Sequence, residues 1–482
     1  MTIFKILSHA SLLVRTDEAS VIIDPWLVGS AYWRSWWNYP LPEFDIDEVR
    51  DVDAVIISHI HWDHWHGPTL KKYLKGKLVV VGDDPNPRSV NDLKQIGFDM
   101  VRVAKHGKKV SIGDIHLHFY NFGLLLNDSA IVIETPEAKI LNANDAKLAG
   151  ASLRHLSKKH GHFDFALRSH SSANPRICYS IHGDKSFVPD DREHYLRSFQ
   201  LFMNAINPTY AIPFASNHCH LQEDVRAFNS YVSKPSELAK FLRSSEANKA
   251  WQFVPMLPGS SWSSVIGFEL KNQDAFDGYE DKIADYSLSV QNRLDHFSEV
   301  EERVQVTTHL LTKFSEMAVK SSVNGLLGVR FLLTKPSGPY KALMFDGQEV
   351  CEVSDYSFAP STGVGLIIIP AVIFRDSVLK NMFHHAGISK RCRYVASSRD
   401  DLVILQAFVA GLERLELIGA GGAHYWSRLI TRYIGRWRDL GVYALAAFYR
   451  FILRYPIYIV EEVILRRHSG ASVGHATKNS KV

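Results

Sequence analysis

Histidines and one aspartate cluster in the segment VDAVIISHIHWDHWHG, which begins as an apolar run. Successive side chains of a strand alternate in direction, so His59 and His61 can point to one side where this strand ends. The turn that follows brings Asp63 and His64 to an adjacent point. Imidazoles suit zinc or iron, and a carboxylate supplies a harder oxygen ligand. The spacing therefore predicts a site that two metal ions could share.

This HxHxDH pattern, together with SVIIDPW and its Asp24, resembles the metallo-β-lactamase superfamily over roughly the first 265 residues. The resemblance implies an α/β fold of two packed mixed sheets flanked by helices, an αββα sandwich with the metals at one edge. It also implies that His59 and His61 bind the first metal ion and that Asp63 and His64 bind the second.

The resemblance leads us to expect further ligands after later strands. ILNANDAKL places Asp145 at the end of an apolar run, where it would bridge both metals; a turn or N-cap aspartate is the alternative. TYAIPFASNHCHLQED offers His220 as the last ligand. His218 faces the same way in a strand and is either its substitute or a substrate-binding residue, and both could be loop histidines. Asp63 and Asp145 are the expected catalytic residues.

One position departs from the family pattern. Where the superfamily places a histidine before the strands that lead to the bridging aspartate, this chain reads GLLLNDSAIVIET, with Asn127 and Asp128. If Asp128 is a ligand, the first site is richer in oxygen, which favours iron or manganese over zinc. If neither residue binds, the site holds a single metal. His106 and His116 are alternative ligands, although their context is that of structural residues.

Within the superfamily, the chain resembles most the branch that includes CMP-N-acetylneuraminate hydroxylases. Four segments carry this resemblance: DPWLVGSAYWRSWWNYPLP, NDSAIVIE, FALRSHSSANPRICYS and YAIPFAS. That branch also has a Rieske domain, whose cluster needs two cysteines and two histidines. We expect no Rieske domain here, so hydroxylation would need a redox partner. The lactonase and N-acyl-phosphatidylethanolamine phospholipase branch matches SHASLLV and IIDPW equally well.

Two further segments could contact a small-molecule substrate. SAYWRSWWNYP groups aromatic side chains, among them Trp36, around the cation Arg34, which suits a planar or sugar group beside an anion. A satellite core under a lid explains the same residues. SHSSANP places His170, Ser171 and Asn174 after a strand, where they could bind polar groups, and turn capping is the alternative.

The elements that must position these residues divide the chain into four parts. Strand-like runs separated by turn residues predict a metallo-β-lactamase-like domain over residues 1–268. A polar helical connector, cap or dimer arm follows over 269–328. Strands return in a small α/β module over 329–410, which weakly resembles a sterol-carrier domain. Residues 411–482 form a basic helical segment whose polar tail after Arg467 is expected to be disordered.

Composition restricts the partners. The 482 residues carry a formal net charge of +4, which indicates no dominant polyanionic partner and no nucleic acid. From His424 onwards, however, ten Lys and Arg stand against three Asp and Glu. In this segment Tyr425, Leu429, Tyr433 and Trp437 recur as an aromatic stripe beside three arginines. That helix is expected either to pack on the protein or to lie on an anionic membrane.

Four scattered cysteines and the absence of a leader-like or membrane-spanning run predict a cytoplasmic protein, with possible peripheral contact at the inner membrane surface and possible homodimerisation. Three functions are compatible with the sequence. The first is a hydrolase in which two divalent metal ions, zinc or iron, activate water toward an ester, amide or phosphoester. The second is a non-haem di-iron oxygenase. The third is a binding protein that keeps a metal only for stability.

Overall fold

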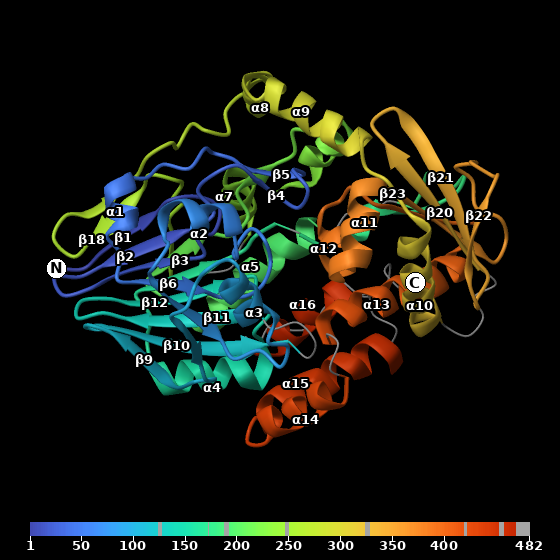
Figure 1. The fold of residues 1–482 in the computed structure, drawn as a ribbon. Helices are drawn as coiled ribbons and strands as arrows, with labels where there is room; N and C mark the ends of the chain where they lie inside the picture. The colour runs from blue at the N-terminus through green and yellow to red at the C-terminus, as the bar shows by residue number, and fades with distance from the viewer. Residues whose placement is uncertain are drawn as a thin grey trace.

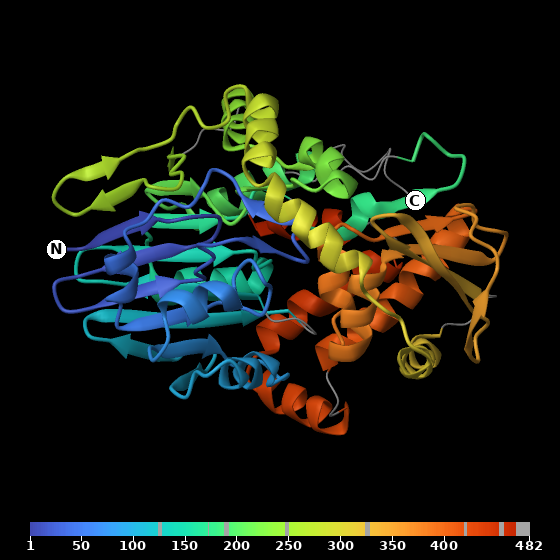
Figure 2. The same ribbon diagram turned by 45° about the horizontal axis from the view of Figure 1, so that its top comes forward.

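The computed structural model describes residues 1–123, 128–171, 173–187, 192–245, 250–322, 328–418, 422–452 and 457–468. Its N-terminal part contains two large sheets packed face to face, and a third large sheet stands apart from them (Figures 1 and 2). A small sheet pairs β16 (His218–Cys219), β5 (Trp36–Asn38) and β4 (Ser30–Ala31). The eight strands of the first sheet run in the order β19 (Gly267–Glu269), β18 (Ser261–Ser263), β1 (Ile3–Ile6), β2 (Leu12–Arg15), β3 (Ser20–Ile23), β6 (Ala54–Ile57), β7 (Leu78–Gly82) and β8 (Val101–Ala104).

The second sheet has seven strands: β17 (Gln252–Phe253), β15 (Tyr210–Pro213), β13 (Phe165–Arg168), β12 (Lys139–Asn144), β11 (Asp128–Glu134), β10 (Ile115–Phe122) and β9 (Lys109–Ile112). Apolar residues from both sheets fill the space between them, among them Phe4, Val21, Phe119, Ile131 and Phe165. Strands buried on both faces read as continuous apolar runs, as AVII of β6 does.

Helices cover the two outer faces of this pair of sheets. The first sheet packs against α2 (Gly67–Tyr73) and α3 (Arg88–Gln95) through Leu70, Leu74 and Leu93. The second sheet packs against α4 (Gly150–His160), α5 (Arg192–Ile206) and α7 (Pro235–Ser244). The layers are therefore αββα, and the predicted α/β sandwich is confirmed.

The third sheet belongs mainly to the C-terminal half of the chain. Its order is β14 (Tyr179–Ile181), β24 (Arg393–Ala396), β23 (Val364–Pro370), β20 (Gly328–Lys335), β21 (Gly338–Phe345) and β22 (Val350–Val353). It packs with α10 (Thr308–Ser321), α11 (Ala371–Lys380) and α13 (Arg399–Ile418) around Phe314, Phe331 and Phe408. Strand β14 comes from the N-terminal part and pairs in parallel with β24, so this small module is completed by a strand from far upstream.

Two more groups of helices connect the parts. Helices α8 (Tyr279–Ser289) and α9 (Gln291–Glu302) span the top of the molecule between the first two sheets and the third (Figure 1). After α13 come α14 (Gly422–Tyr433), α15 (Trp437–Ala447) and α16 (Ile457–His468). Helix α16 packs on α5 and α4, and α15 packs on α4, so these helices return to the N-terminal sandwich.

The aromatic stripe predicted near the C-terminus divides between the interior and the surface. Leu429 and Tyr433 are buried, whereas 65% of Trp437 is exposed. The side chain of Tyr425 and the tail after His468 lie outside the described residues. No helix among the described residues is both long and apolar enough to cross a membrane.

Candidate metal centre

The predicted ligands lie at one edge of the first sheet, where two parallel strands end. Strand β6 is buried along its whole length and leads into the loop that carries His59 and His61. Its parallel neighbour β3 ends at Asp24. The loop closes into α2, where the His66 side chain caps the helix by accepting a hydrogen bond from the Thr69 backbone. Parallel pairing and this cap together hold the loop at the strand ends.

A first group of donors consists of two imidazoles and one carboxylate. His59 Nε2 lies 2.8 Å from His61 Nδ1. The carboxylate of Asp128, at the start of β11, lies 3.9 Å from His59 Nε2. The three ligand atoms are within 4.8 Å of one another. Two histidines and one carboxylate with open positions are the ligand set typical of non-haem iron(II) oxygenases.

A second group of donors surrounds His64. Its Nε2 lies 3.3 Å from Asp145 and 3.5 Å from Asp63. His9, in the turn between β1 and β2, places its Nε2 3.0 Å from the same oxygen of Asp63. His59 and His64 have ring centroids 4.1 Å apart, so the two groups are contiguous. The two groups together contain enough donor atoms to bind two metal ions.

Buried polar side chains orient these donors. Asp24, fully buried, accepts hydrogen bonds from the Ser58 backbone and hydroxyl and lies 2.8 Å from His64 Nδ1. The Nε2 of His64 is thereby turned toward Asp63 and Asp145. Tyr32 donates from its hydroxyl to Asp63 at 2.5 Å. Such partners fix the ring orientation and tautomer of a metal-ligating histidine.

The electrostatics of the donors suit a bound cation. Burial lowers the pKa of His59 to about 4, so its ring is neutral and keeps a lone pair for a metal. Burial also lowers the pKa of His61. Burial, and then the negative charge of the neighbouring Asp145, raise the pKa of Asp128 to about 8. A bound cation would relieve the repulsion between the two carboxylates. His64 Nε2 and one oxygen of Asp128 are buried without a hydrogen-bond partner among the described residues. These unpartnered atoms fit a metal centre.

His220 is not in either donor group among the described residues. Its Nδ1 lies 2.8 Å from the carbonyl oxygen of Ser35. His218 stacks on Trp36 with the ring centroids 3.8 Å apart. His106 and His116 also fall outside the groups. Asn127, the other residue at the divergent position, lies outside the described residues.

Three of the predicted substrate-binding residues make contacts with other parts of the protein. The Arg34 guanidinium lies 3.6 Å above the Phe297 ring. The Ser171 hydroxyl accepts from the Ser233 backbone, and Asn174 caps the short helix that follows it. His170 differs from them, because it is fully buried and neither ring nitrogen has a hydrogen-bond partner among the described residues.

Two histidines at the centre are absent from the sequence prediction. His9 belongs to the segment SHASLLV, and its place just after the first strand was the signal that could have found it. His384 had no such signal, because it lies in α12 (Phe383–Ile388) of the C-terminal module. Its Nε2 lies 3.0 Å from His61 Nε2, on the side of that ring opposite His59. The module therefore reaches the metal centre directly.

A buried carboxylate holds α12 in this position. Glu416 of α13 accepts a hydrogen bond of 2.7 Å from the His384 backbone, contacts the His385 ring, and lies 3.1 Å from the Arg88 guanidinium. Arg88 belongs to α3 of the N-terminal sandwich. The same carboxylate thus joins the module to the domain that carries the other ligands.

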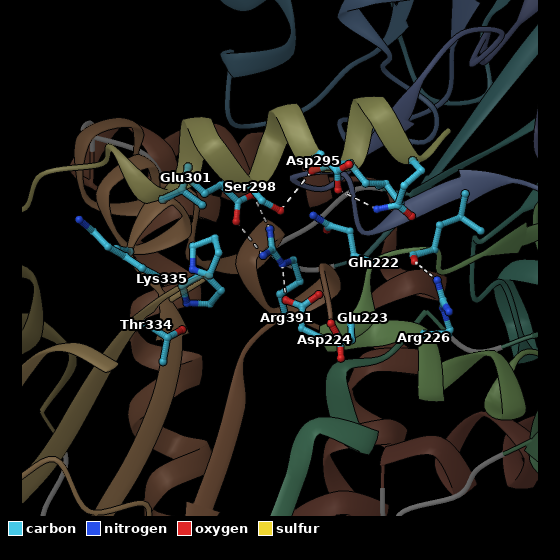
Figure 3. Close-up of a pocket in the computed structure, with 17 residues that line it drawn as sticks. Gln222, Glu223, Asp224, Arg226, Asp295, Ser298, Glu301, Thr334, Lys335 and Arg391 are labelled. Atoms are coloured by element: carbon cyan, nitrogen blue, oxygen red, sulfur yellow. Dashed lines mark hydrogen bonds and ion pairs between the residues drawn. The ribbon is translucent and has the colours of Figure 1, made fainter. Parts of the chain in front are cut away.

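A separate cavity of about 580 Å³ lies where the chain after His220, helix α9 and the C-terminal module meet (Figure 3). Arg391 projects into this junction and binds Glu301 at 2.8 Å and Asp224 at 2.6 Å. The volume is that of a small-molecule pocket. None of the metal-centre donors lines it.

Residues 4–158 match the family described as Beta-lactamase superfamily domain, so this segment carries such a domain. The chain is also homologous to two groups of proteins over about half of its length. A Mycobacterium tuberculosis protein provisionally named as a Rieske 2Fe-2S iron-sulfur protein is 26% identical over 273 residues, 52% of either chain. The cytidine monophosphate-N-acetylneuraminic acid hydroxylase of Danio rerio is 26% identical over 289 residues, 56% of this chain and 47% of the hydroxylase. The chain thus spans about half the length of these relatives.

Solved structures with similar folds include both hydrolases and hydroxylases. An isothiocyanate hydrolase from Delia radicum gut bacteria is 14% identical with a TM-score of 0.41, covering 55% of this chain and 99% of the hydrolase. CmlA, a diiron beta-hydroxylase from Streptomyces venezuelae, is 15% identical with a TM-score of 0.35, covering 53% of each chain.

Proposed function

We propose that this chain is an iron-dependent hydroxylase of a small, polar, anionic substrate. The observation that carries the proposal is the first donor group, His59, His61 and Asp128, which is the two-histidine, one-carboxylate set typical of iron(II) oxygenases. The homology to hydroxylases supports it. The sequence alone ranks hydrolysis first, and the position of Asp128 beside His59 changes that order.

The residues of the chain have distinct roles in this proposal. His59, His61 and Asp128 would hold one iron, and His64, Asp63 and Asp145 the other, with His9 available to the second. Bound iron would supply dioxygen activation. Asp24 and Tyr32 orient the second donor group through hydrogen bonds to His64 and Asp63, respectively.

Hydroxylation requires two electrons and two protons in addition to dioxygen. One oxygen atom enters a C–H bond of the substrate and the other leaves as water. A separate redox protein, of the iron–sulfur or flavin class, would supply the electrons. CMP-N-acetylneuraminic acid, which names the homologous hydroxylases, is the first substrate to test.

Metal identification in protein purified without added metal tests the proposal. We expect stoichiometric iron by mass spectrometry, an absorption band in air that bleaches on anaerobic reduction, and dioxygen consumption with a reductase system and CMP-N-acetylneuraminic acid. Protein that contains only zinc, and that gains no activity when iron replaces it, would contradict the assignment.

A second candidate function is metal-dependent hydrolysis, favoured by the second donor group. Asp63 and Asp145 both face His64, as in a site that lowers the pKa of a metal-bound water. The zinc-loaded chain would then cleave esters, amides or phosphoesters in a substrate panel without dioxygen or reductant. Turnover that persists under anaerobic conditions distinguishes this function from hydroxylation.

A further inference from the structure

A second cluster of metal-ligand side chains lies away from the candidate centre, where the end of α4 meets strands β10 and β11. It contains His118 of β10, Glu134 at the end of β11, and His160, the last residue of α4. We propose that these three residues form an additional divalent metal site, suited to zinc, that ties α4 to the second sheet. This inference is independent of the proposed function.

The distances within the cluster fit a single ion. His160 Nδ1 lies 3.0 Å from one carboxylate oxygen of Glu134, and His118 Nε2 lies 3.5 Å from the other. The two imidazole centroids are 4.8 Å apart. Zinc bound at about 2.1 Å from nitrogen and oxygen donors holds those donors about 3 to 3.5 Å apart. An ion could therefore enter with small rotations of the side chains.

The outer contacts of the cluster also resemble those of a metal site. The second nitrogen of the His160 ring, Nε2, lies 2.6 Å from the Tyr120 hydroxyl. A ligating histidine commonly engages a polar partner with its free ring nitrogen, which fixes the tautomer. Tyr120 is itself buried and in edge contact with the His160 ring, so this orientation is rigid.

Burial and charge set the affinity of the site. Both histidines are buried, while the Glu134 side chain is 28% exposed, which leaves an entry path and room for a water ligand. Burial lowers the pKa of His118 and of His160, so both rings are neutral near pH 7. Two neighbouring cations oppose a metal: Lys139, whose Nζ lies 4.0 Å from Glu134, and Lys159, whose charge lowers the pKa of both histidines.

Equilibrium dialysis of the full chain against zinc tests the site. We expect the triple variant His118→Gln, Glu134→Gln, His160→Gln to bind one zinc fewer per chain than the wild type. The control is His162→Gln, an exposed histidine two residues beyond the cluster, which should leave the stoichiometry unchanged. Circular dichroism of each variant verifies folding.

Two conservative variants keep the test decisive if the triple variant misfolds. Tyr120→Phe removes the outer partner and should weaken zinc binding at this site about tenfold or more. Lys139→Met removes one of the competing cations and should strengthen it. With cobalt as the probe, the loss of one set of visible bands in the triple variant is expected. Equal zinc content and equal cobalt spectra in wild type and triple variant would overturn the proposal.

A different observation concerns the outside of α14 and the start of α15, at the lower edge of the molecule (Figure 1). Trp426 and Ile430 of α14, Ile434 in the turn that follows and Trp437 at the start of α15 are here called the outer stripe. They are 48% to 74% exposed. Leu429 and Tyr433 of α14, by contrast, are buried against the protein.

We infer that the outer stripe binds an anionic lipid membrane. Tryptophan and isoleucine on one face of a surface helix are the groups that enter the boundary between headgroups and acyl chains. Arg438 lies over the Trp437 ring at 4.5 Å, so a cation accompanies the apolar face. The side chains of Arg432 and Arg436 in this stretch are largely buried and paired with Asp83 and Asp439. The attraction to anionic headgroups therefore comes from Arg438 and from the remaining excess of basic residues after His424.

Vesicle co-sedimentation tests this surface. The wild type should bind vesicles of phosphatidylcholine mixed equally with phosphatidylserine, and not vesicles of phosphatidylcholine alone. Ile430→Ser with Ile434→Ser should weaken binding at least about tenfold. The control is Val265→Ser with Ile266→Ser, two equally exposed apolar residues between β18 and β19, which should bind as the wild type does.

Salt should weaken the binding of the wild type, because part of the attraction is electrostatic. A second copy of this chain is the alternative partner for the outer stripe, and sedimentation velocity on the same proteins would detect such a dimer. A wild-type dimer that the Ile430→Ser, Ile434→Ser variant dissociates, or equal vesicle binding by wild type and that variant, would overturn the inference.

Discussion

His64 lies where the two donor groups meet. Its ring is fully buried, so a charge on it has no contact with water. Burial by itself lowers the pKa of this imidazole, but the carboxylates of Asp63 and Asp24 raise it well above its ordinary value. The carboxylates therefore favour the protonated form of the ring. A metal replaces the proton, so binding should release it and depend on pH.

Asp24 controls the orientation of that ring. Asp24→Asn weakens the acceptor for His64 Nδ1 while preserving size, and we expect metal affinity to fall about 10- to 100-fold, as for other outer-shell partners. Metal titration monitored by competition with a chelator measures the change. Asp53→Asn is the control, since Asp53 also bonds a strand backbone, at Ser20, but lies outside the centre. Equal losses in both variants would contradict a specific role for Asp24.

Asp128 sets the chemical character of the first donor group. Replacing it in an Asp128→His variant gives three imidazoles in that group, which shifts the preference from iron toward zinc. We expect a higher ratio of zinc to iron in protein purified from the same medium, together with loss of hydroxylation. Mass spectrometry of both proteins provides the ratio, and an unchanged ratio would show that Asp128 is not a ligand.

At the scale of secondary structure, the short helix α12 couples the C-terminal module to the centre. A helix of six residues is weakly stable alone, and Glu416 satisfies its first backbone N–H groups. The interaction with Arg88 extends this support to α3. The position of His384 beside His61 is therefore fixed by the neighbouring helix α13 and by α3 of the N-terminal part.

The contact between α12 and the metal ligand can be tested directly. His384→Ala removes the partner of His61 Nε2, and we expect metal affinity to fall about 10- to 100-fold with a changed absorption spectrum of the iron-loaded protein. His384→Gln, whose amide oxygen can accept the same hydrogen bond, should recover part of the affinity. His309→Ala, at an exposed position of α10, is the control. A spectrum unaffected by His384→Ala would count against the coupling.

At the scale of the whole molecule, chain order and spatial order differ. Strand β14 leaves the N-terminal part to pair with β24, and helices α15 and α16 return from the C-terminus to cover α4 and α5. Arg391 joins Glu301 and Asp224 at the junction of the three parts (Figure 3). Segments separated by hundreds of residues therefore pack into one assembly.

Glu413 in α13 makes the stability of this assembly depend on pH. Burial, and then the nearby Glu416, raise its pKa to about 8. Between its ordinary pKa and about 8 the folded state binds more protons than the unfolded state, so the free energy of unfolding falls as pH rises through this window. Glu413→Gln should abolish that slope, of at most about 1.4 kcal/mol per pH unit.

Urea unfolding at pH 5, 6.5 and 8 compares the two proteins, and the variant should gain stability over the wild type as pH rises. Glu349→Gln, at an exposed turn beyond β21, serves as control. Parallel pH profiles for wild type and Glu413→Gln would refute the assignment.

The strand pattern and the HxHxDH motif were enough to predict the αββα sandwich and the local part of the candidate metal centre. A strand end followed by HxHxDH constrains His59, His61, Asp63 and His64 through bonds only a few residues long, so spacing alone brings them together. Asp145 was predicted from its place at the end of an apolar strand, and its carboxylate lies 3.3 Å from His64 Nε2.

The long-range part of the centre depends on how the elements pack in three dimensions. His384 meets His61 across 323 residues of chain, a contact that follows from the packing of the module and from no local pattern. The same holds for His9 beside Asp63, and for the placement of His220 outside the donor groups. Periodicity reports the direction of a side chain within its own element, whereas the partners of that side chain depend on how the elements pack.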